Sequence, residues 1–193
     1  LTERILSTFD FNHYEINLST RPEKSIGSEA VWELATKGLT EALERKGWNF
    51  KIDEGGGAFY GPKIDLKIED AIGRMWQCST IQLDFNLPER FELEYVAADG
   101  SRRSPIMIHR AIFGSLERFF GIMTENYAGD FPFWLAPEQI RLLPVTDEVM
   151  PYAEQLLEQL KAAGIRATLD HSGERLGKLI RNGEQMKIPL LGV

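Results

Sequence analysis

The chain has 193 residues, of which 43% are hydrophobic and 26% are charged, and its formal net charge is −7 at pH 7. This composition excludes a disordered chain, and no apolar run approaches the roughly 20 residues that span a bilayer. The negative charge argues against non-specific nucleic-acid binding, and the single cysteine, Cys78, excludes an internal disulfide and is typical of a reducing compartment.

The first part of the chain is predicted to alternate strands with helices. Apolar and polar residues alternate over 11–19, which predicts a half-buried strand. Ser28 is a good helix N-cap and Gly47 a typical helix stop, so we expect a helix between them. Its apolar side is expected to comprise Val31, Leu34, Leu39, Ala42 and Leu43. A short strand is expected at 48–53.

Four further extended segments are expected in the first domain. Turn-forming residues separate them, which is typical of an antiparallel meander. They cover residues 64–70, 73–85, 90–96 and 104–112. A helix from about Gly114 to Glu125 is expected to cover this sheet, with Leu116 and Phe120 in its apolar stripe.

The pattern changes after the proline-containing segment 130–139, which predicts a linker. We therefore divide the chain into domains at 1–134 and 135–193. In the second domain, Asp147 is expected to cap a helix that Gly164 ends. The order strand, helix, strand, helix, strand predicts a small α/β domain with a parallel core, and we expect it to be truncated after its last strand.

A glycine-rich segment, GGGAFYGPK at 55–63, is the first candidate for ligand binding. Its glycines would let a ligand approach the backbone, while Tyr60 offers a hydroxyl group and Lys63 a mobile positive charge. It lacks the GxxxxGK[ST] pattern of a Walker loop. A flexible hairpin connection is the alternative interpretation.

The second candidate is a set of small polar side chains on the strand expected at 73–85, namely Gln77, Cys78, Thr80 and Gln82. Buried polar groups need partners, and a ligand could supply them. Strict alternation puts Gln77 and Thr80 on opposite faces, so a ligand that uses both requires a twist or a bulge. A sheet face exposed to water is the alternative.

The segment MIHRAIFGSLER, at 107–118, combines a metal-ligand residue type with a tight turn and an arginine. His109, Ser115 and Arg118 lie close together along the chain, which favours a site for a small polar molecule bearing phosphate. The alternative is a buried strand that leads into an ordinary helix, with His109 as a core histidine. Zinc needs at least three protein ligands, and the chain contains no local HxxH or CxxC.

A basic cluster lies near the C-terminus. Within 175–187, Arg175, Lys178, Arg181 and Lys187 are opposed only by Glu184. The cluster is either a solvated helix face or a local surface for RNA.

Five segments together resemble the bacterial-type threonyl-tRNA synthetase family. They occur in the family's order and spacing, and the resemblance covers essentially the whole chain. They read STRPEKSIGS, GGGAFYGPKIDL, WQCSTIQLDFNLPERF, MIHRAIFGSLERF and FPFWLAPEQIRLLPV. The resemblance implies an α+β class II synthetase-like antiparallel sheet with flanking helices, followed by a truncated α/β anticodon-binding domain. Domain 1–134 would then be the C-terminal half of the catalytic domain.

The resemblance also implies a reaction and its partners. Threonine and ATP, with Mg²⁺, would form threonyl-adenylate, and the threonyl group would pass to tRNA(Thr). A cytoplasmic, homodimeric parent protein without membrane association is expected. A sister class II synthetase and a noncatalytic paralogue that acts as an RNA-binding or regulatory module remain alternatives.

Residue roles follow from the same resemblance. His109 would be one of three ligands of a Zn²⁺ that recognises the amino and hydroxyl groups of threonine. The remaining roles are catalysis for Arg118 and Lys63; substrate binding for Tyr60, Gln82 and Ser115; ATP binding for Gln77, Thr80, Glu117 and Arg118; and tRNA binding for Arg175, Lys178, Arg181 and Asn182. Glu117 is expected to orient Arg118.

Several family elements are expected before Leu1. They are the motif 1 dimer interface, the motif 2 arginine and the other two zinc ligands, a cysteine and a histidine. Neither Cys78 nor His13 has the sequence context of these ligands. We therefore expect the 193 residues alone to be inactive.

Overall fold

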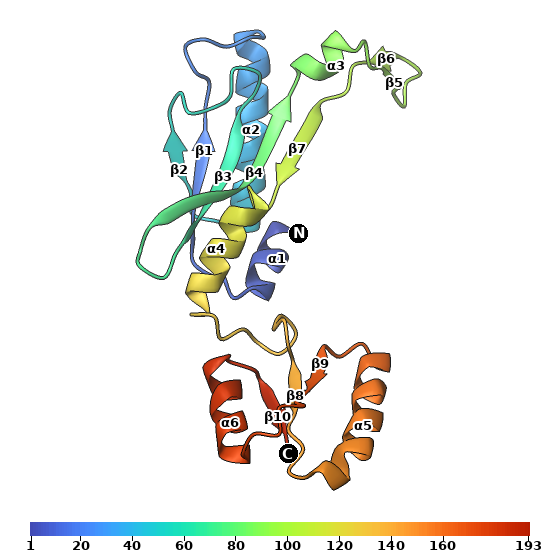
Figure 1. The fold of residues 1–193 in the computed structure, drawn as a ribbon. Coiled ribbons are helices and arrows are strands. Elements are labelled where there is room, and N and C mark those ends of the chain that lie inside the picture. Colours follow the sequence, from blue (N-terminus) through green and yellow to red (C-terminus); the bar gives the residue numbers. More distant parts are fainter. The chain divides into compact units, whose positions relative to one another are not determined.

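The computed structural model of the protein describes all of residues 1–193, which form two compact units (Figure 1). The first unit is Leu1–Met123 and the second is Thr124–Val193. Residues 130–139 belong to the second unit, where Arg166 donates hydrogen bonds from its guanidinium to the carbonyl oxygens of Ala136 and Trp134 at 2.9 and 2.8 Å.

A five-stranded sheet with the order β2-β1-β3-β4-β7 forms the first unit. Its strands are β1 (Tyr14–Ser19), β2 (Lys51–Asp53), β3 (Lys63–Glu69), β4 (Met75–Asp84) and β7 (Met107–Ala111). The predicted antiparallel pairing is confirmed for β1 with β3, β3 with β4 and β4 with β7. β1 and β2 are parallel, because the helix α2 (Glu29–Lys46) returns the chain to the same end of the sheet (Figure 1).

The ends of α2 agree with the sequence prediction, and its buried face agrees in part. The Ser28 hydroxyl accepts a hydrogen bond from a first-turn amide, and Gly47 ends the helix in the left-handed conformation with φ of 69°. Leu34 was expected on the apolar side and is 69% exposed. Leu39 and Leu43 are buried as predicted, and Trp32 and Ala35 complete the buried face in place of Leu34.

The expected strand at 90–96 is wrong. β4 pairs directly with β7, and the chain between them forms α3 (Asn86–Arg90) and a separate hairpin of β5 (Tyr95–Val96) and β6 (Arg102–Arg103). The Asp84 carboxylate explains the departure from the sheet. It accepts hydrogen bonds from the backbone amides of Asn86 and Leu87, at 2.8 and 3.1 Å, and so starts a helical turn.

β4 contains a bulge that decides which side chains share a face. Leu66 of β3 is paired with Ser79, whereas the next residue of β3 is paired with Gln77, so Cys78 is an extra residue in β4. Cys78 is therefore buried, and its burial raises the pKa of the thiol. This bulge is the irregularity that allows Gln77 and Thr80 to share one face of the sheet.

Two further helices pack at one end of the first unit. The sequence did not predict α1 (Thr2–Thr8), whereas α4 (Leu116–Asn126) was expected. The rings of Phe9 and Phe119 meet edge to face at 5.1 Å. This contact covers one side of α4 only, so Leu116, predicted to be in its apolar stripe with Phe120, is 70% exposed, and Phe120 is 60% exposed.

The second unit has the predicted parallel core. Its three-stranded sheet has the order β10-β8-β9 and consists of β8 (Ile140–Leu142), β9 (Ala167–Leu169) and β10 (Leu190–Gly192). The helices α5 (Met150–Ala162) and α6 (Leu176–Gln185) flank it (Figure 1). No helix in the chain combines the length and the apolar character that crossing a membrane requires.

The start of α5 differs from the prediction. Asp147 does not cap this helix, because it begins a separate 3-10 turn, η1 (Asp147–Val149). α5 then starts at Met150 and has a proline in its first turn. Gly164 follows the end of α5 with φ of 79°, as expected for a helix stop.

Replacing Gly61 is expected to destabilise the first unit. A Cβ atom there would lie 1.8 Å from the carbonyl oxygen of Leu83. The glycine-rich segment 55–63, called the glycine loop below, would therefore have to move away from β4. Gly61→Ala should lower the free energy of unfolding by about 1–3 kcal/mol, measured by urea unfolding. Gly121→Ala in α4 is the control, because its Cβ meets nothing within 4 Å, and it should be neutral or stabilising. Equal effects would contradict the close approach.

Asp70 is expected to make the folded state sensitive to acid. Burial acts to raise its pKa, but hydrogen bonds from Trp76, Arg74 and the Ile72 amide outweigh burial and hold the pKa well below its usual range. The stabilisation is therefore present at neutral pH and is lost as the pH falls below about 4. Asp70→Asn should lower stability at pH 7 more than at pH 3 in urea titrations. An equal loss at both values would refute this.

Candidate active site

Most of the predicted ligand-binding residues of the first unit lie on three neighbouring strands and the glycine loop, whereas Ser115, Glu117 and Arg118 lie at the start of α4. Backbone register places Lys63 beside Gln82, and Gln82 beside His109, across β3, β4 and β7. Two groups of side chains result. The histidine cluster comprises Tyr60, Gln82, Asp84 and His109, and the Asp65 cluster comprises Lys63, Asp65, Gln77 and Thr80.

The glycine loop is held in place, which argues against a flexible connection. The hydroxyl of Thr20 accepts a hydrogen bond from the Gly55 amide at 3.2 Å, and its carbonyl oxygen accepts one from the Gly57 amide at 2.8 Å. A Cβ on Gly57 would lie 2.4 Å from that same carbonyl oxygen. The STRPEKSIGS segment therefore anchors the loop that carries Tyr60.

The histidine cluster has an unused hydrogen-bond donor. Tyr60 donates its hydroxyl proton to Gln82 Oε1 at 3.1 Å, and its ring lies 6.4 Å from the ring of His109, centre to centre. The Nε2 group of Gln82 is buried and has no partner. Leaving a buried amide unpaired costs about 1–3 kcal/mol, so this atom is well suited to a polar ligand.

A buried carboxylate that the sequence analysis missed orients His109. The Nε2–H group of His109 donates to Asp84 Oδ2 at 2.8 Å, which leaves Nδ1 for another partner. Burial acts to raise the pKa of Asp84, but the hydrogen bonds from His109 and from the Leu87 and Asn86 amides lower it overall, so the carboxylate stays ionised. A histidine held in this way is typical of metal ligands.

The Asp65 cluster contains a second missed carboxylate. Asp65 is 3% exposed and accepts hydrogen bonds from Gln77 Nε2 at 2.6 Å and Thr80 Oγ1 at 2.7 Å, together with an ion pair from Lys63. The bulge at Cys78 puts Gln77 and Thr80 on the same face, 3.1 Å apart between Nε2 and Oγ1. Three predicted site residues thus share one anchor.

Arg118 lies against the start of the bulge. Its Nη1 donates to the carbonyl oxygen of Gln77 at 3.1 Å, and its guanidinium lies 5.7 Å from the centre of the Trp76 ring. Ser115 accepts the Arg118 amide proton at 3.1 Å and so caps the first turn of α4. No hydrogen bond or ion pair joins Glu117 to Arg118, so the expected orienting role passes to Gln77 and Trp76.

Gly114 brings α4 close to β4. It has φ of 70°, and a Cβ there would lie 3.2 Å from the carbonyl oxygen of Cys78. Ser79 strengthens this approach because its hydroxyl donates to the carbonyl oxygen of Ile112. The turn between β7 and α4 therefore sets the position of Arg118.

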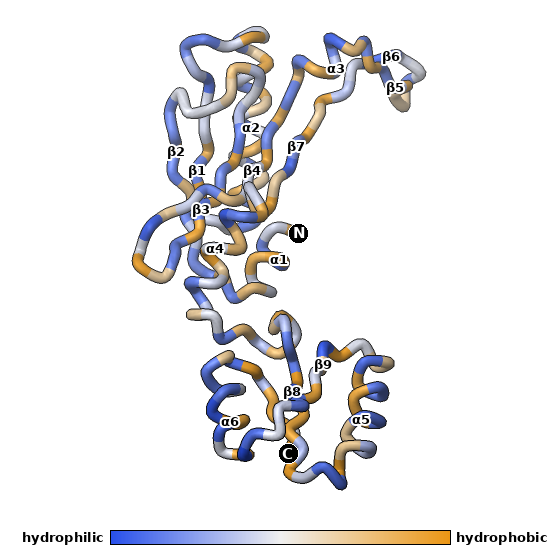
Figure 2. Tube along the Cα trace, in the orientation of Figure 1, coloured by the Kyte–Doolittle hydropathy of each residue, from blue (hydrophilic) through white to orange (hydrophobic).

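The predicted tRNA-binding residues lie in the second unit, on α6 and at its start. Arg175, Lys178 and Arg181 are exposed, whereas Leu179 is buried. Much of α6 is coloured as hydrophilic (Figure 2). Lys178 pairs with Glu174 at 2.7 Å, so only part of the basic charge is free. Asn182 is half-buried.

The 193 residues do not hold a complete metal site. No group of three or more histidine, cysteine, aspartate or glutamate side chains could bind an ion. Cys78 is buried and His13 is exposed just before β1, so neither joins His109. Among the 193 residues, His109 therefore has neither of these two residues as a further ligand.

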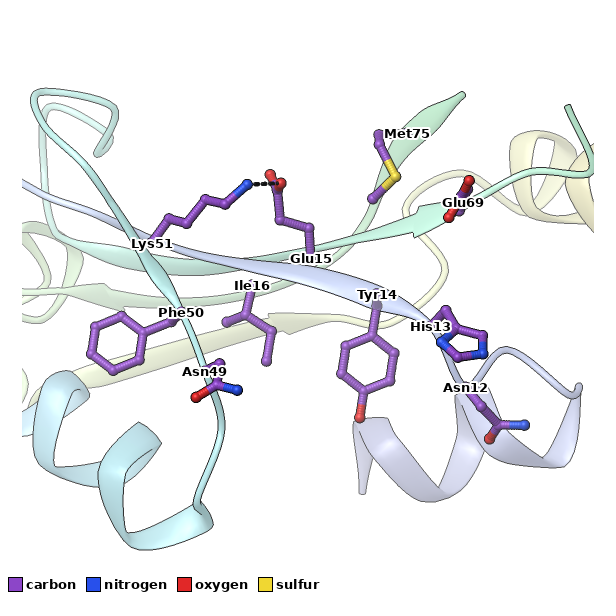
Figure 3. A pocket seen from close by; sticks show the side chains of 10 residues that line it. All are labelled: Asn12, His13, Tyr14, Glu15, Ile16, Asn49, Phe50, Lys51, Glu69 and Met75. Carbon is purple, nitrogen blue, oxygen red and sulfur yellow. Dashed lines mark hydrogen bonds and ion pairs between the residues drawn. The ribbon is translucent and has the colours of Figure 1, made fainter. Parts of the chain in front are cut away.

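A separate hollow of about 500 Å³ lies beside β1 and β2 (Figure 3). Figure 3 shows Glu15 and Lys51 pointing toward each other on one side of the sheet, whereas Tyr14 and Ile16 lie on the other side. The ion pair of Glu15 with Lys51 is 2.5 Å long, and the hydrogen bond from Lys51 contributes most to lowering the pKa of Glu15 to about 2. Two charged groups of this hollow, Glu15 and Lys51, thus neutralise each other.

Comparisons with known proteins agree with this arrangement. Residues 1–127 match the family described as "tRNA synthetase class II core domain (G, H, P, S and T)", and residues 139–193 match "Anticodon binding domain". These matches confirm the class II synthetase-like fold that the sequence predicted.

The most similar curated relatives include threonine–tRNA ligases. Over the whole chain, the one from Synechococcus sp. (strain CC9902) is 91% identical, and the chloroplastic/mitochondrial 2 protein of Arabidopsis thaliana is 63% identical. The chain spans 32% and 30% of these relatives, about a third of their length.

Solved structures give the same result. The RNA binding domain of threonyl-tRNA synthetase from Cryptosporidium parvum Iowa II is 37% identical, with a TM-score of 0.93; the match covers 100% of this chain and 48% of that one. Histidyl-tRNA synthetase from S. aureus, at 17% identity and a TM-score of 0.54, shares the fold; the match covers 98% of this chain and 53% of that one. The chain belongs to the class II tRNA synthetase core family (G, H, P, S and T), with an anticodon-binding domain following that core.

Proposed function

We propose that the chain is part of a threonine–tRNA ligase, which activates threonine with ATP and transfers the threonyl group to tRNA(Thr). The observation that carries the proposal is the convergence of the histidine cluster and the Asp65 cluster on adjacent strands. One cluster has a free donor and an oriented histidine, and the other has a cation and polar groups. The names of the relatives support threonine as the amino acid.

The histidine cluster is proposed to bind threonine. A Zn²⁺ held by His109 and two ligands outside these residues would act as a Lewis acid that recognises the amino and hydroxyl groups of threonine. Asp84 keeps the His109 ring in position. Tyr60 fixes Oε1 of Gln82, so that Nε2 can donate to the substrate. Selection by hydroxyl contacts rejects valine more strongly than an apolar pocket would.

The neighbouring residues are proposed to bind ATP with Mg²⁺. Arg118 and Lys63 supply positive charge for the phosphates, while Gln77 and Thr80 supply polar contacts. Such sites act mainly by positioning the reactants and stabilising developing charge, and they need no covalent nucleophile. Ser115 and Glu117, at the start of α4, keep their proposed roles in substrate and ATP binding.

The second unit is proposed to contact the tRNA anticodon through Arg175, Lys178, Arg181 and Asn182. The full-length protein is proposed to be a cytoplasmic homodimer. We expect the 193 residues alone not to activate threonine, because they contribute a single zinc ligand.

The proposal can be tested in a full-length chimera, in which this chain replaces the matching third of the Synechococcus sp. (strain CC9902) relative. Threonine-dependent exchange between ATP and pyrophosphate measures formation of the adenylate. We expect exchange with threonine and far less with valine. Tight tRNA binding without exchange would instead support a noncatalytic RNA-binding paralogue.

His109 is predicted to be essential for zinc binding. His109→Ala in the chimera should weaken zinc affinity by at least about a hundredfold, and Asp84→Asn by roughly ten- to a hundredfold, because the ring loses its orientation. Competition with a chromophoric chelator measures both. His171→Ala, at an exposed histidine, is the control. Unchanged zinc affinity in His109→Ala would rule out the ligand role.

The basic residues of α6 are predicted to affect tRNA and not adenylate formation. Arg181→Ala should raise KM for tRNA(Thr) roughly tenfold through loss of a charge-assisted contact, with exchange unchanged. Lys161→Ala on α5, which removes another exposed charge of the same unit, should leave KM unchanged. Similar values for both variants would assign the cluster to a solvated helix face.

A further inference from the structure

Asp65 is a buried ionisable group whose side-chain partners are all proposed site residues. Its side chain is 5% exposed, and the donors that surround it are the Lys63 ammonium, the Gln77 amide and the Thr80 hydroxyl. A buried carboxylate is costly unless such partners compensate it, and an apolar replacement of the whole network is often as stable. A contribution to the stability of the fold is therefore not a sufficient explanation for a buried polar network at this position.

We propose that Asp65 is a positioning residue for the nucleotide half of the reaction, an inference that rests on the proposed function. It holds Lys63, Gln77 and Thr80 in one arrangement before ATP binds. Because Asp65 is buried behind these side chains, the nucleotide meets Lys63, Gln77 and Thr80 and not the carboxylate, and the Lys63 ammonium supplies the positive charge for the phosphates. Arg118 does not contact Asp65 and adds a positive charge from α4.

Asp65 also fixes which atoms face the ligand. Gln77 uses Nε2 to donate to Asp65, so its Oε1 is left as an acceptor. Thr80 likewise donates its hydroxyl proton to Asp65; its oxygen accepts a hydrogen bond from Gln77 Nε2 at 3.1 Å and keeps one lone pair for a further donor. The cluster thus presents acceptors to hydrogen-bond donors of the ligand, such as the ribose hydroxyls or the adenine amino group of ATP.

Asp70 provides a matched comparison in the turn that joins the same two strands. It is also a buried aspartate, one residue after the end of β3, with a side chain that is 0% exposed. Its partners are the backbone amides of Ile72 and Arg74 and the side chains of Arg74 and Trp76, which shape the turn between β3 and β4. Asp70 therefore stabilises the fold, whereas Asp65 organises side chains that face a ligand.

The test uses Asp65→Asn in the full-length chimera. Asparagine keeps the shape but directs an NH₂ group at one of three donors, so the cluster must rearrange. We expect KM for ATP to rise, or kcat for exchange to fall, on the order of ten- to a hundredfold, with KM for threonine changed less than about twofold. Asp70→Asn is the control, and it should lower the unfolding midpoint without changing KM for ATP.

The outcomes separate the two proposals. A chimera without threonine-dependent exchange would overturn the proposed function and this inference with it. An active chimera in which Asp65→Asn leaves KM for ATP and kcat unchanged would overturn the inference alone, as would equal changes in KM for ATP and for threonine. If Asp65→Asn does not fold, Asp65→Ser, which leaves room for a water molecule, takes its place with the same expected and contradicting results.

Discussion

The bulge at Cys78 is the constraint on which the rest of the site depends. A regular strand would direct Gln77 and Thr80 to opposite faces, and the carboxylate of Asp65 could not contact both. The extra residue turns the thiol of Cys78 into the core and brings the two polar side chains together. The same stretch of backbone receives Arg118 at the carbonyl oxygen of Gln77. One irregularity therefore aligns groups from β3, β4 and α4.

Two buried carboxylates complete the arrangement. Asp84 orients His109 and also turns the chain out of the sheet after β4, while Asp65 joins three donors from β3 and β4. Burial acts against the charged form of Asp84, and the hydrogen bonds restore that form. These contacts hold the site in place before a ligand arrives, which lowers the cost of ordering it later.

Local signals predicted much of the fold. The Ser28 cap, the Gly47 stop, the Gly164 stop and the parallel core of the second unit follow from short stretches of sequence. The prediction of a strand at 90–96 was wrong because the pairing of β4 with β7 depends on residues far apart in the chain. Asp65 and Asp84 were missed for the same reason. An aspartate in an apolar strand signals an unusual position, but the partners that explain it lie on other strands.

A crystal structure of the full-length chimera with a non-hydrolysable threonyl-adenylate analogue tests the account most directly. The account predicts that Gln77 and Thr80 lie on the ligand side with Asp65 behind them, that the threonyl end lies between Tyr60 and His109, and that Cys78 stays in the core. A regular β4 with Cys78 facing the ligand, or an analogue bound away from both clusters, would contradict it.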